Sequence, residues 1–193
     1  MTGSNSFWFA NPSSGFYNSV ATQSLRLNDD DSAYLNETAG TPTDSQKWTS
    51  SLWVKRGSLG SEMGLVSSSA TAEYIRFESD DTLRYRLYQS GAQRISMITS
   101  AVFRDITAWY HIVCAVDLSN TTDNDKVIIY VNGTRQALGT NTTTTTDTYD
   151  SVMLTSGNDI WIGRNSSSYF DGYMAEINFI DGLQLAPTSF GET

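Results

Sequence analysis

Cysteine and histidine are nearly missing from this chain of 193 residues, which contains one of each, Cys114 and His111. A single cysteine excludes a disulfide framework within the chain. One cysteine and one histidine are also too few for a zinc site of the usual Cys and His composition. The fold must therefore be stabilised by packing.

Basic residues are also scarce. The chain has 12 Lys plus Arg against 21 Asp plus Glu, a formal net charge of -9. Nucleic-acid binding depends on clustered cations, so we expect no nucleic-acid partner. No run approaches the roughly 18 apolar residues of a membrane helix, and the first residues lack the basic start and apolar run of a signal peptide. We therefore expect no membrane insertion.

Short runs rich in β-branched and aromatic residues recur from residue 24 onward, with turn residues between them. In residues 82–89 and 170–180 apolar side chains alternate with polar ones, which predicts strands with one buried face. The expected strands are residues 24–27, 33–36, 47–56, 64–69, 73–78, 82–89, 94–99, 109–117, 126–131, a return from residue 134, 159–163 and 170–180. No window has helical spacing, so we predict an all-β fold, a two-sheet antiparallel sandwich.

A hairpin is predicted at KVIIYVNGTRQAL, residues 126–138. Asn132-Gly133 is typical of a two-residue turn in which both residues have positive φ. The strand before it is apolar on both faces, which indicates a strand covered on both sides. The threonine-rich residues 139–151 are expected to form a loose hairpin or an exposed loop, because β-branched residues favour extended backbone.

Residues 1–22 combine Gly, Ser and Asn with five aromatic side chains. A disordered tail would carry fewer aromatic groups. Two interpretations stay open: an arm that docks on a neighbouring subunit, and an edge strand of the same domain. The expected domain organisation is an arm at residues 1–22 and a sandwich at residues 23–193.

Five segments follow one another in a specific order. They are SLRLNDDDSAYLN (24–36), KWTSSLWVKR (47–56), AWYHIVCAVD (108–117), KVIIYVNGTRQAL (126–138) and DIWIGRNSSSYFDGYMAEINFIDGLQLAP (159–187). In this order they resemble the laminin-G-like family of concanavalin A-like domains, which implies a jelly-roll sandwich. The segment FDGYMAEINFIDG, with a short tail ending in FGE, is most similar to the laminin-G-like domains in structural proteins of tailed, especially marine, bacteriophages.

The resemblance implies a non-catalytic virion protein of the decoration, fibre or adhesin type that binds glycans through rim loops. The implied partners are other virion proteins, further copies of this chain, and host or environmental glycans. The implied location is the particle surface, which is extracellular after release. Two alternatives stay open: a secreted or cell-surface carbohydrate-binding module, and a glycoside hydrolase of the same fold.

The candidate ligand-binding residues are aromatic and polar side chains near predicted loops: Trp161, Arg164, Tyr169 and Tyr149. Sugars stack on aromatic faces and bond to polar side chains, which suits these residue types. Ordinary surface aromatics, or contacts with a neighbouring subunit, are the alternative.

Many laminin-G-like domains hold calcium at the rim of the sandwich, and calcium takes six to eight oxygen ligands. The resemblance therefore implies calcium as the candidate cofactor but does not specify its ligands. We select Asp29, Asp31 and Asp171 from a wider set of residues in acidic turns, which also includes Asp30, Asp80, Asp81, Asp123, Asn124 and Asp125. Acidic turn residues that only solvate a hairpin are the alternative.

No catalytic residues are predicted. A retaining glycosidase needs two carboxylates about 5 Å apart, which one strand face supplies through residues two or four apart. Glu73 and Glu78 are five apart and should face opposite sides, as should Asp171 and Glu176 unless a bulge intervenes.

The histidine and the cysteine offer no nucleophile and base pair either. His111 and Cys114 are three apart on a predicted strand and should point to opposite faces. We expect His111 to be a hydrogen-bonded structural residue. Gly172 is expected at a turn or a close approach of two backbones.

Overall fold

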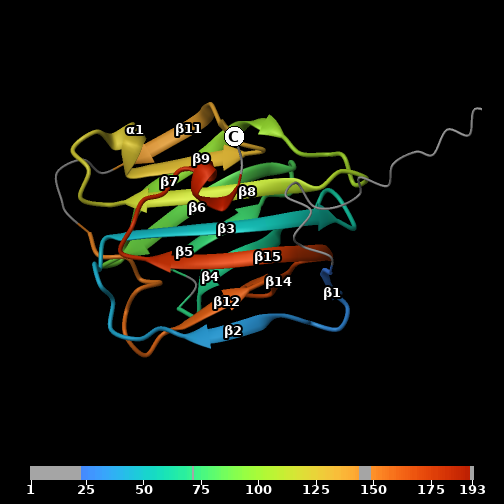
Figure 1. The fold of residues 1–193 in the computed structure, drawn as a ribbon, viewed down its shortest axis with the longest axis horizontal. Coiled ribbons are helices and arrows are strands. Elements are labelled where there is room, and N and C mark those ends of the chain that lie inside the picture. Colours follow the sequence, from blue (N-terminus) through green and yellow to red (C-terminus); the bar gives the residue numbers. More distant parts are fainter. Residues whose placement is uncertain (1–22, 71, 144–148, 192–193) are drawn as a thin grey trace, which may run out of the picture.

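Two antiparallel β-sheets stack on each other (Figure 1). The computed structural model describes residues 23–70, 72–143 and 149–191. The six-stranded sheet has the order β1 (Leu25–Leu27), β15 (Gly172–Asp181), β3 (Lys47–Arg56), β8 (Tyr110–Asp117), β9 (Val127–Val131) and β10 (Thr134–Arg135). The predicted fold class, an all-β antiparallel jelly-roll sandwich, is confirmed.

The seven-stranded sheet has β2 at one edge and β11 at the other. Its order is β11 (Leu138–Thr143), β7 (Ala92–Val102), β6 (Thr82–Gln89), β5 (Glu73–Phe77), β4 (Met63–Ser68), β12 (Asp159–Ile162) and β2 (Leu35–Thr38). A small hairpin, β13 (Arg164–Asn165) and β14 (Ser168–Tyr169), follows β12 directly. The edge strand β2 therefore lies beside a strand more than 120 residues later in the chain.

The core lies between the sheets and is built from alternate side chains of each strand. On β8 the inward residues are Ile112, Cys114 and Val116, each 0% exposed. On β6 the predicted alternation also holds, because Leu83, Tyr85 and Leu87 are fully buried. Burying each such side chain stabilises the fold by roughly 1.5–3 kcal/mol.

The Asn-Gly hairpin has the predicted geometry. Asn132 and Gly133 have φ angles of 49° and 73°, both positive. The Asn132 side-chain oxygen also accepts a hydrogen bond from the backbone N–H of His111, at 2.8 Å. This bond fixes the turn between β9 and β10 to the neighbouring strand β8.

Gly172 confirms the predicted close approach of two backbones. A Cβ atom at this position would lie 2.1 Å from the carbonyl oxygen of Lys55, and φ is 147°. No other residue fits there, because any side chain would collide with β3. Gly172 therefore sets how closely β15 packs beside β3.

Two segments differ from the predicted elements. The first part of the threonine-rich segment, predicted as a loose hairpin or loop, forms strand β11, which pairs with β7. The hairpin β13–β14 was not predicted at all. Two short helices, α1 (Asp123–Lys126) and η1 (Pro187–Phe190), complete the described elements.

The predicted arm at residues 1–22 lies outside the described residues. The division into an arm and a sandwich therefore stays a prediction. Within the described ranges, none of the helices has the length and apolar character needed to cross a membrane.

Candidate functional site

Three aromatic side chains gather around one arginine at the β2 edge of the seven-stranded sheet. The Arg164 guanidinium carbon lies 4.0 Å from the ring centre of Trp161, 4.7 Å from that of Tyr34 and 5.3 Å from that of Tyr169. The Tyr34 ring in turn lies 5.9 Å from Trp161 and 6.2 Å from Tyr169. These four residues are called the Arg164 cluster below.

The pleat of β12 aims Trp161 out of the core. Its neighbour Ile160 is 7% exposed and belongs to the core, so Trp161 faces the other way. Trp161 lies between Ser67 of β4 and Asn36 of β2 in the ladder. Tyr34 directly precedes β2, so the pairing of β2 with β12 brings Tyr34 close to Trp161.

The hairpin β13–β14 places the other two members. Ser166 has a φ of 56°, and after this turn Tyr169 pairs directly with Arg164. The Ser67 hydroxyl donates a hydrogen bond to the Arg164 carbonyl oxygen, at 2.8 Å. A Cβ atom on Gly64 would lie 2.2 Å from the Arg164 carbonyl carbon, so the hairpin packs directly on the backbone of β4.

Among the described residues, most hydrogen-bond donors of the Arg164 side chain have no partner. Its Nε donates to the carbonyl oxygen of Ser166 at 2.9 Å. Within the described part of the chain, the two Nη atoms make no hydrogen bond or ion pair. A positive guanidinium among three rings, with its terminal N–H groups unpaired, can accept a planar anion such as a carboxylate in two parallel hydrogen bonds.

Two arginines on the outer face of the same sheet are already paired with carboxylates. Arg76 binds both carboxylate oxygens of Glu62, each at 2.6 Å, and also Glu78 at 2.9 Å. Arg84 lies 3.5 Å from Glu78. Arg164 therefore differs from them in having no carboxylate partner among the described residues.

The structure brings together three of the four predicted ligand-binding residues. Trp161, Arg164 and Tyr169 lie in one cluster, but Tyr149 does not belong to it. Tyr149 is 8% exposed and lies under the guanidinium of Arg94, on β7. In the sheet order, β6, β5, β4 and β12 separate β7 from β2.

Tyr34 is the member that sequence reasoning missed. It is 38% exposed and contacts the three other members. Its position in a predicted strand gave no indication that this strand would pair with β12. Only the pairing of β2 with β12, which lies far along the chain, shows that Tyr34 belongs to the cluster.

The three candidate calcium ligands do not come together in a metal site. Asp171 binds the guanidinium of Arg26 at 2.7 Å. Asp29 accepts a hydrogen bond from the Asp30 N–H, and Asp31 accepts one from the Asn28 side chain. Across residues 23–70, 72–143 and 149–191, no three His, Cys, Asp or Glu side chains could hold a metal ion together. These donors do not fit the six to eight oxygens of calcium, and calcium binding stays a prediction.

Glu73 is a buried carboxylate in the core. It is 0% exposed and accepts hydrogen bonds from Trp48, Tyr85, Ser151 and the backbone of Met153, at 2.6–3.2 Å. Burial raises its pKa, and these four hydrogen bonds oppose that effect without cancelling it. Because both carboxylate oxygens bind groups inside the protein, Glu73 has a structural role: it ties residues 151–153 to the core.

The other carboxylate pair weighed for hydrolysis lies around a bulge. The register between β15 and β3 shifts between Ala175 and Asn178, and Glu176 there has a φ of 45°. Because a bulge interrupts the alternation of side chains at Glu176, Asp171 and Glu176 need not face opposite sides of the sheet. Asp171, however, is engaged by Arg26.

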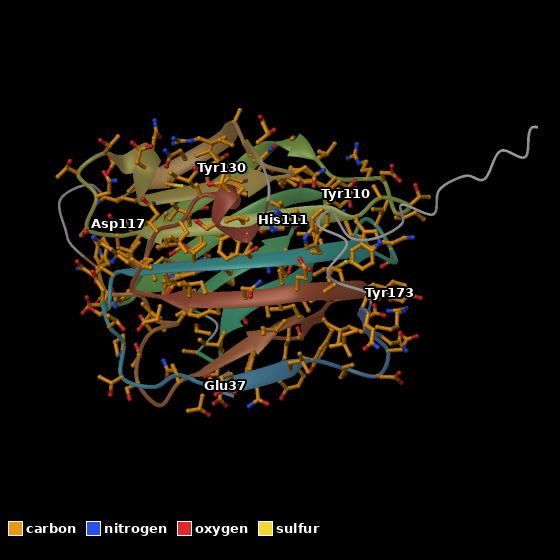
Figure 2. All side chains as sticks on the ribbon, viewed as in Figure 1. Glu37, Tyr110, His111, Asp117, Tyr130 and Tyr173 are labelled. Carbon is orange, nitrogen blue, oxygen red and sulfur yellow. The ribbon has the colours of Figure 1, made fainter. Side chains whose placement is uncertain are left out.

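His111 lies on the outer face of the six-stranded sheet, opposite Cys114 in the core (Figure 2). Its Nε2 is 2.8 Å from the hydroxyl of Ser51, and its ring stacks on Trp53 at 4.9 Å. His111 is 1% exposed, which suits the predicted structural role. Burial raises the pKa of the Cys114 thiol well above its usual value, so the thiol stays protonated.

Solved structures with a similar fold include several domains with bound sugars. Domain 4 of an extracellular arabinanase from Geobacillus stearothermophilus, solved with arabinotriose, has a TM-score of 0.58 and 18% identity over 84% of this chain and 72% of that chain. The CBM40 domain of the Ruminococcus gnavus IT-sialidase, solved with α2,3-sialyllactose, has a TM-score of 0.56 and 10% identity over 84% and 92% of the two chains.

A third solved structure is that of a proposed carbohydrate-binding protein from Bacteroides ovatus. It has a TM-score of 0.55 and 16% identity over 76% of this chain, which spans 40% of that chain. At these identities the likeness shows the fold. No curated protein sequence matches the chain. The family model of the concanavalin A-like lectin/glucanases superfamily, in its laminin-G-like form, matches residues 27–184. The chain belongs to this superfamily.

Proposed function

We propose that this chain is a non-catalytic domain that binds glycans bearing a carboxylate, and that it does so at the Arg164 cluster. The observation that carries the proposal is the state of Arg164. Its guanidinium lies within 4.0–5.3 Å of three aromatic ring centres, and its Nη atoms have no partner among the described residues.

The arrangement suits a sugar acid better than a neutral sugar. A carboxylate matches the two parallel N–H groups of a guanidinium, and a charge-assisted pair of this kind is about twice as strong as neutral hydrogen bonds. The rings of Tyr34 and Trp161 limit the positions of the guanidinium, so less side-chain entropy is lost on binding. Their remaining exposed surface offers apolar contact to a sugar ring.

The related structures support glycan binding without choosing between acidic and neutral sugars. One was solved with arabinotriose, which is neutral, and another with sialyllactose, which carries a carboxylate. The choice of an acidic glycan for this chain rests on Arg164.

The non-catalytic part of the proposal rests on where the carboxylates lie. Near the cluster, the Ser168 hydroxyl lies 3.4 Å from Glu62, but both Glu62 oxygens are bound by Arg76. With both oxygens bound by Arg76, the Glu62 carboxylate is not free to contact a glycosidic oxygen. Glu73, whose pKa is raised, is enclosed in the core and has no access to a glycan.

The bacteriophage role stays a prediction. A virion decoration, fibre or adhesin protein on the particle surface, with other virion proteins and its own copies as partners, is compatible with a glycan-binding edge. A secreted or cell-surface carbohydrate-binding module is equally compatible. Purification of the particle or cell fraction that contains the chain would separate these two settings.

The direct test compares one glycan with and without its charge. Titration calorimetry with trigalacturonate and with its methyl ester measures the contribution of the carboxylates, and sialyllactose with lactose gives a second pair. We expect at least about tenfold tighter binding of each acid, which corresponds to about 1.4 kcal/mol. Equal affinity for acid and ester, or release of reducing sugar from either, would overturn the proposal. Repeating the titrations with a chelator tests the calcium prediction.

A further inference from the structure

A pocket of about 240 Å³ opens at the same edge of the sandwich, on the other face of β12 from the Arg164 cluster. The segment 39–42 that follows β2 and the end of β15 both contribute to its lining. Its lining includes Glu37, Pro42, Leu154, Ile160, Phe179 and Asp181. Glu37 lies on β2, at the edge of the molecule (Figure 2).

The floor of the pocket is apolar and comes from both sheets. Ile160 of β12 and Leu154 are 7% and 4% exposed. Phe179 of β15 lies on the other side and stacks on the core residue Trp48, with ring centres 5.2 Å apart. Because these side chains are anchored in the core, the floor is preformed and suits a small apolar group.

The rim of the pocket is acidic. Glu37 pairs with Ile160 in the ladder, so both side chains leave the strands on the same face, toward the pocket. Asp181 contributes a second carboxylate. The described residues that line the pocket include no Lys, Arg or His. Both charges are therefore uncompensated by the lining itself.

One carboxylate oxygen of Asp181 lacks a donor. Its Oδ2 accepts a hydrogen bond from the backbone N–H of Thr43 at 2.5 Å. Its Oδ1 is shielded from solvent and accepts no hydrogen bond from any described residue. Buried polar atoms in folded proteins almost always have a partner, so the Asp181 carboxylate can take a further donor if its side chain rotates to bring Oδ1 to the pocket.

We propose that this pocket binds a small organic cation, an ammonium group carried on an apolar alkyl or aromatic body. The ammonium bonds to Asp181 and lies near Glu37, and the apolar body rests on Ile160 and Phe179. A metal ion is a poorer occupant, because no three metal-ligating side chains of the described residues gather here. The site is independent of the Arg164 cluster and prefers the opposite charge.

The test uses benzylammonium as the probe and benzyl alcohol and benzoate as its neutral and anionic counterparts. Backbone amide NMR shifts of the full chain are followed during each titration. We expect benzylammonium to bind with a Kd on the order of 1 mM, and the two counterparts at least about tenfold more weakly. The shifts should centre on residues 38–42, 160 and 179–181. Equal affinity for benzyl alcohol, or shifts centred elsewhere, would overturn the proposal.

Charge-removing variants sharpen the test. D181N keeps the acceptor for the Thr43 N–H, and together with E37Q it should weaken benzylammonium binding at least about tenfold. E176Q, on the same strand but outside the lining, should stay within about twofold of the parent chain. If D181N does not fold, E37Q alone, at an exposed position, should weaken binding about threefold. R164K should leave the benzylammonium affinity unchanged, so failure here is distinguishable from failure of the glycan proposal.

Discussion

The guanidinium carbon of Arg164 lies 4.0 Å from the centre of the Trp161 ring. The complete cluster forms only when both β2 and the hairpin β13–β14 are in place. A cation over an aromatic ring at this distance gains roughly 0.5–2 kcal/mol, depending on how far it is desolvated. The contact therefore positions the arginine without consuming its terminal N–H groups.

Replacing Arg164 by lysine tests whether the fork of N–H groups is needed, and not merely a positive charge. Lysine keeps the charge but cannot form the two parallel hydrogen bonds to a carboxylate. We expect R164K to weaken binding of the acidic glycan at least about tenfold, measured by titration calorimetry. R135K is the matched control, because Arg135 is an exposed arginine paired with Asp125 on the other sheet. Equal losses in the two variants would contradict the assignment.

Tyr34 is expected to support binding by holding the guanidinium. Y34A removes one of three rings around Arg164, so binding of the acidic glycan should weaken about three- to tenfold. Because Tyr34 is 38% exposed, the free energy of unfolding should change by less than about 1 kcal/mol.

The control for Y34A is Y88A. Tyr88 is 37% exposed and also lies under an arginine, Arg86, at 5.1 Å. It belongs to β6 and makes no contact with the Arg164 cluster. A weakening of glycan binding by Y88A as large as that by Y34A would show a general effect of losing a surface aromatic.

The buried carboxylate of Glu73 gives a signed pH dependence. Burial raises its folded-state pKa above the ordinary value of 4.5. Its contribution to stability is therefore fully present below about pH 4.5 and is lost as the pH rises through the folded-state pKa. The difference in unfolding free energy between the parent chain and E73Q should fall as the pH rises above about 4.5, measured by urea denaturation at a series of pH values.

The same pair of proteins also tests the hydrogen-bond network. Either orientation of the glutamine amide places its NH₂ group against an N–H donor, that of Trp48 or that of Met153. We expect this conflict to cost roughly 1–3 kcal/mol, apart from the pH-dependent part. A stability difference that is flat over this pH range, or that grows with pH, would contradict the account of Glu73.

Gly172 should be among the least replaceable residues of the fold. G172A places a methyl group 2.1 Å from the carbonyl oxygen of Lys55, so β15 must move away from β3. We expect a loss of more than about 2 kcal/mol of unfolding free energy, measured by denaturant titration. G40A is the control, because a Cβ atom on Gly40 meets nothing within 4 Å. A G172A loss no larger than that of G40A would contradict the close approach.

The layers of this fold follow from local patterns, and for that reason they were predictable. Period-two alternation in residues 82–89 assigned the inward side chains of β6, and the Asn132-Gly133 pair located the turn after β9. Both signals act over a few residues. The jelly-roll type of the sandwich came from the family resemblance, and the order of strands in each sheet came only from the structure.

The site was only partly predictable, because it depends on pairing between distant segments. Trp161 meets Tyr34 through the ladder of β12 and β2, which no local pattern specifies. The turn of the hairpin β13–β14 has Ser166 at positive φ in place of the usual Asn-Gly or Gly, so it gave no turn signal. The position of Tyr149, under Arg94 and away from the other three candidates, depends on tertiary packing and could not be read from the sequence.

A crystal structure of the chain with the acidic oligosaccharide that binds most tightly tests the central claim most directly. The account predicts the carboxylate of the sugar within hydrogen-bond distance, about 2.7–2.9 Å, of both Nη atoms of Arg164, with the sugar ring against Trp161 or Tyr34. A bound sugar whose carboxylate faces solvent, or that lies away from Arg164, would contradict it.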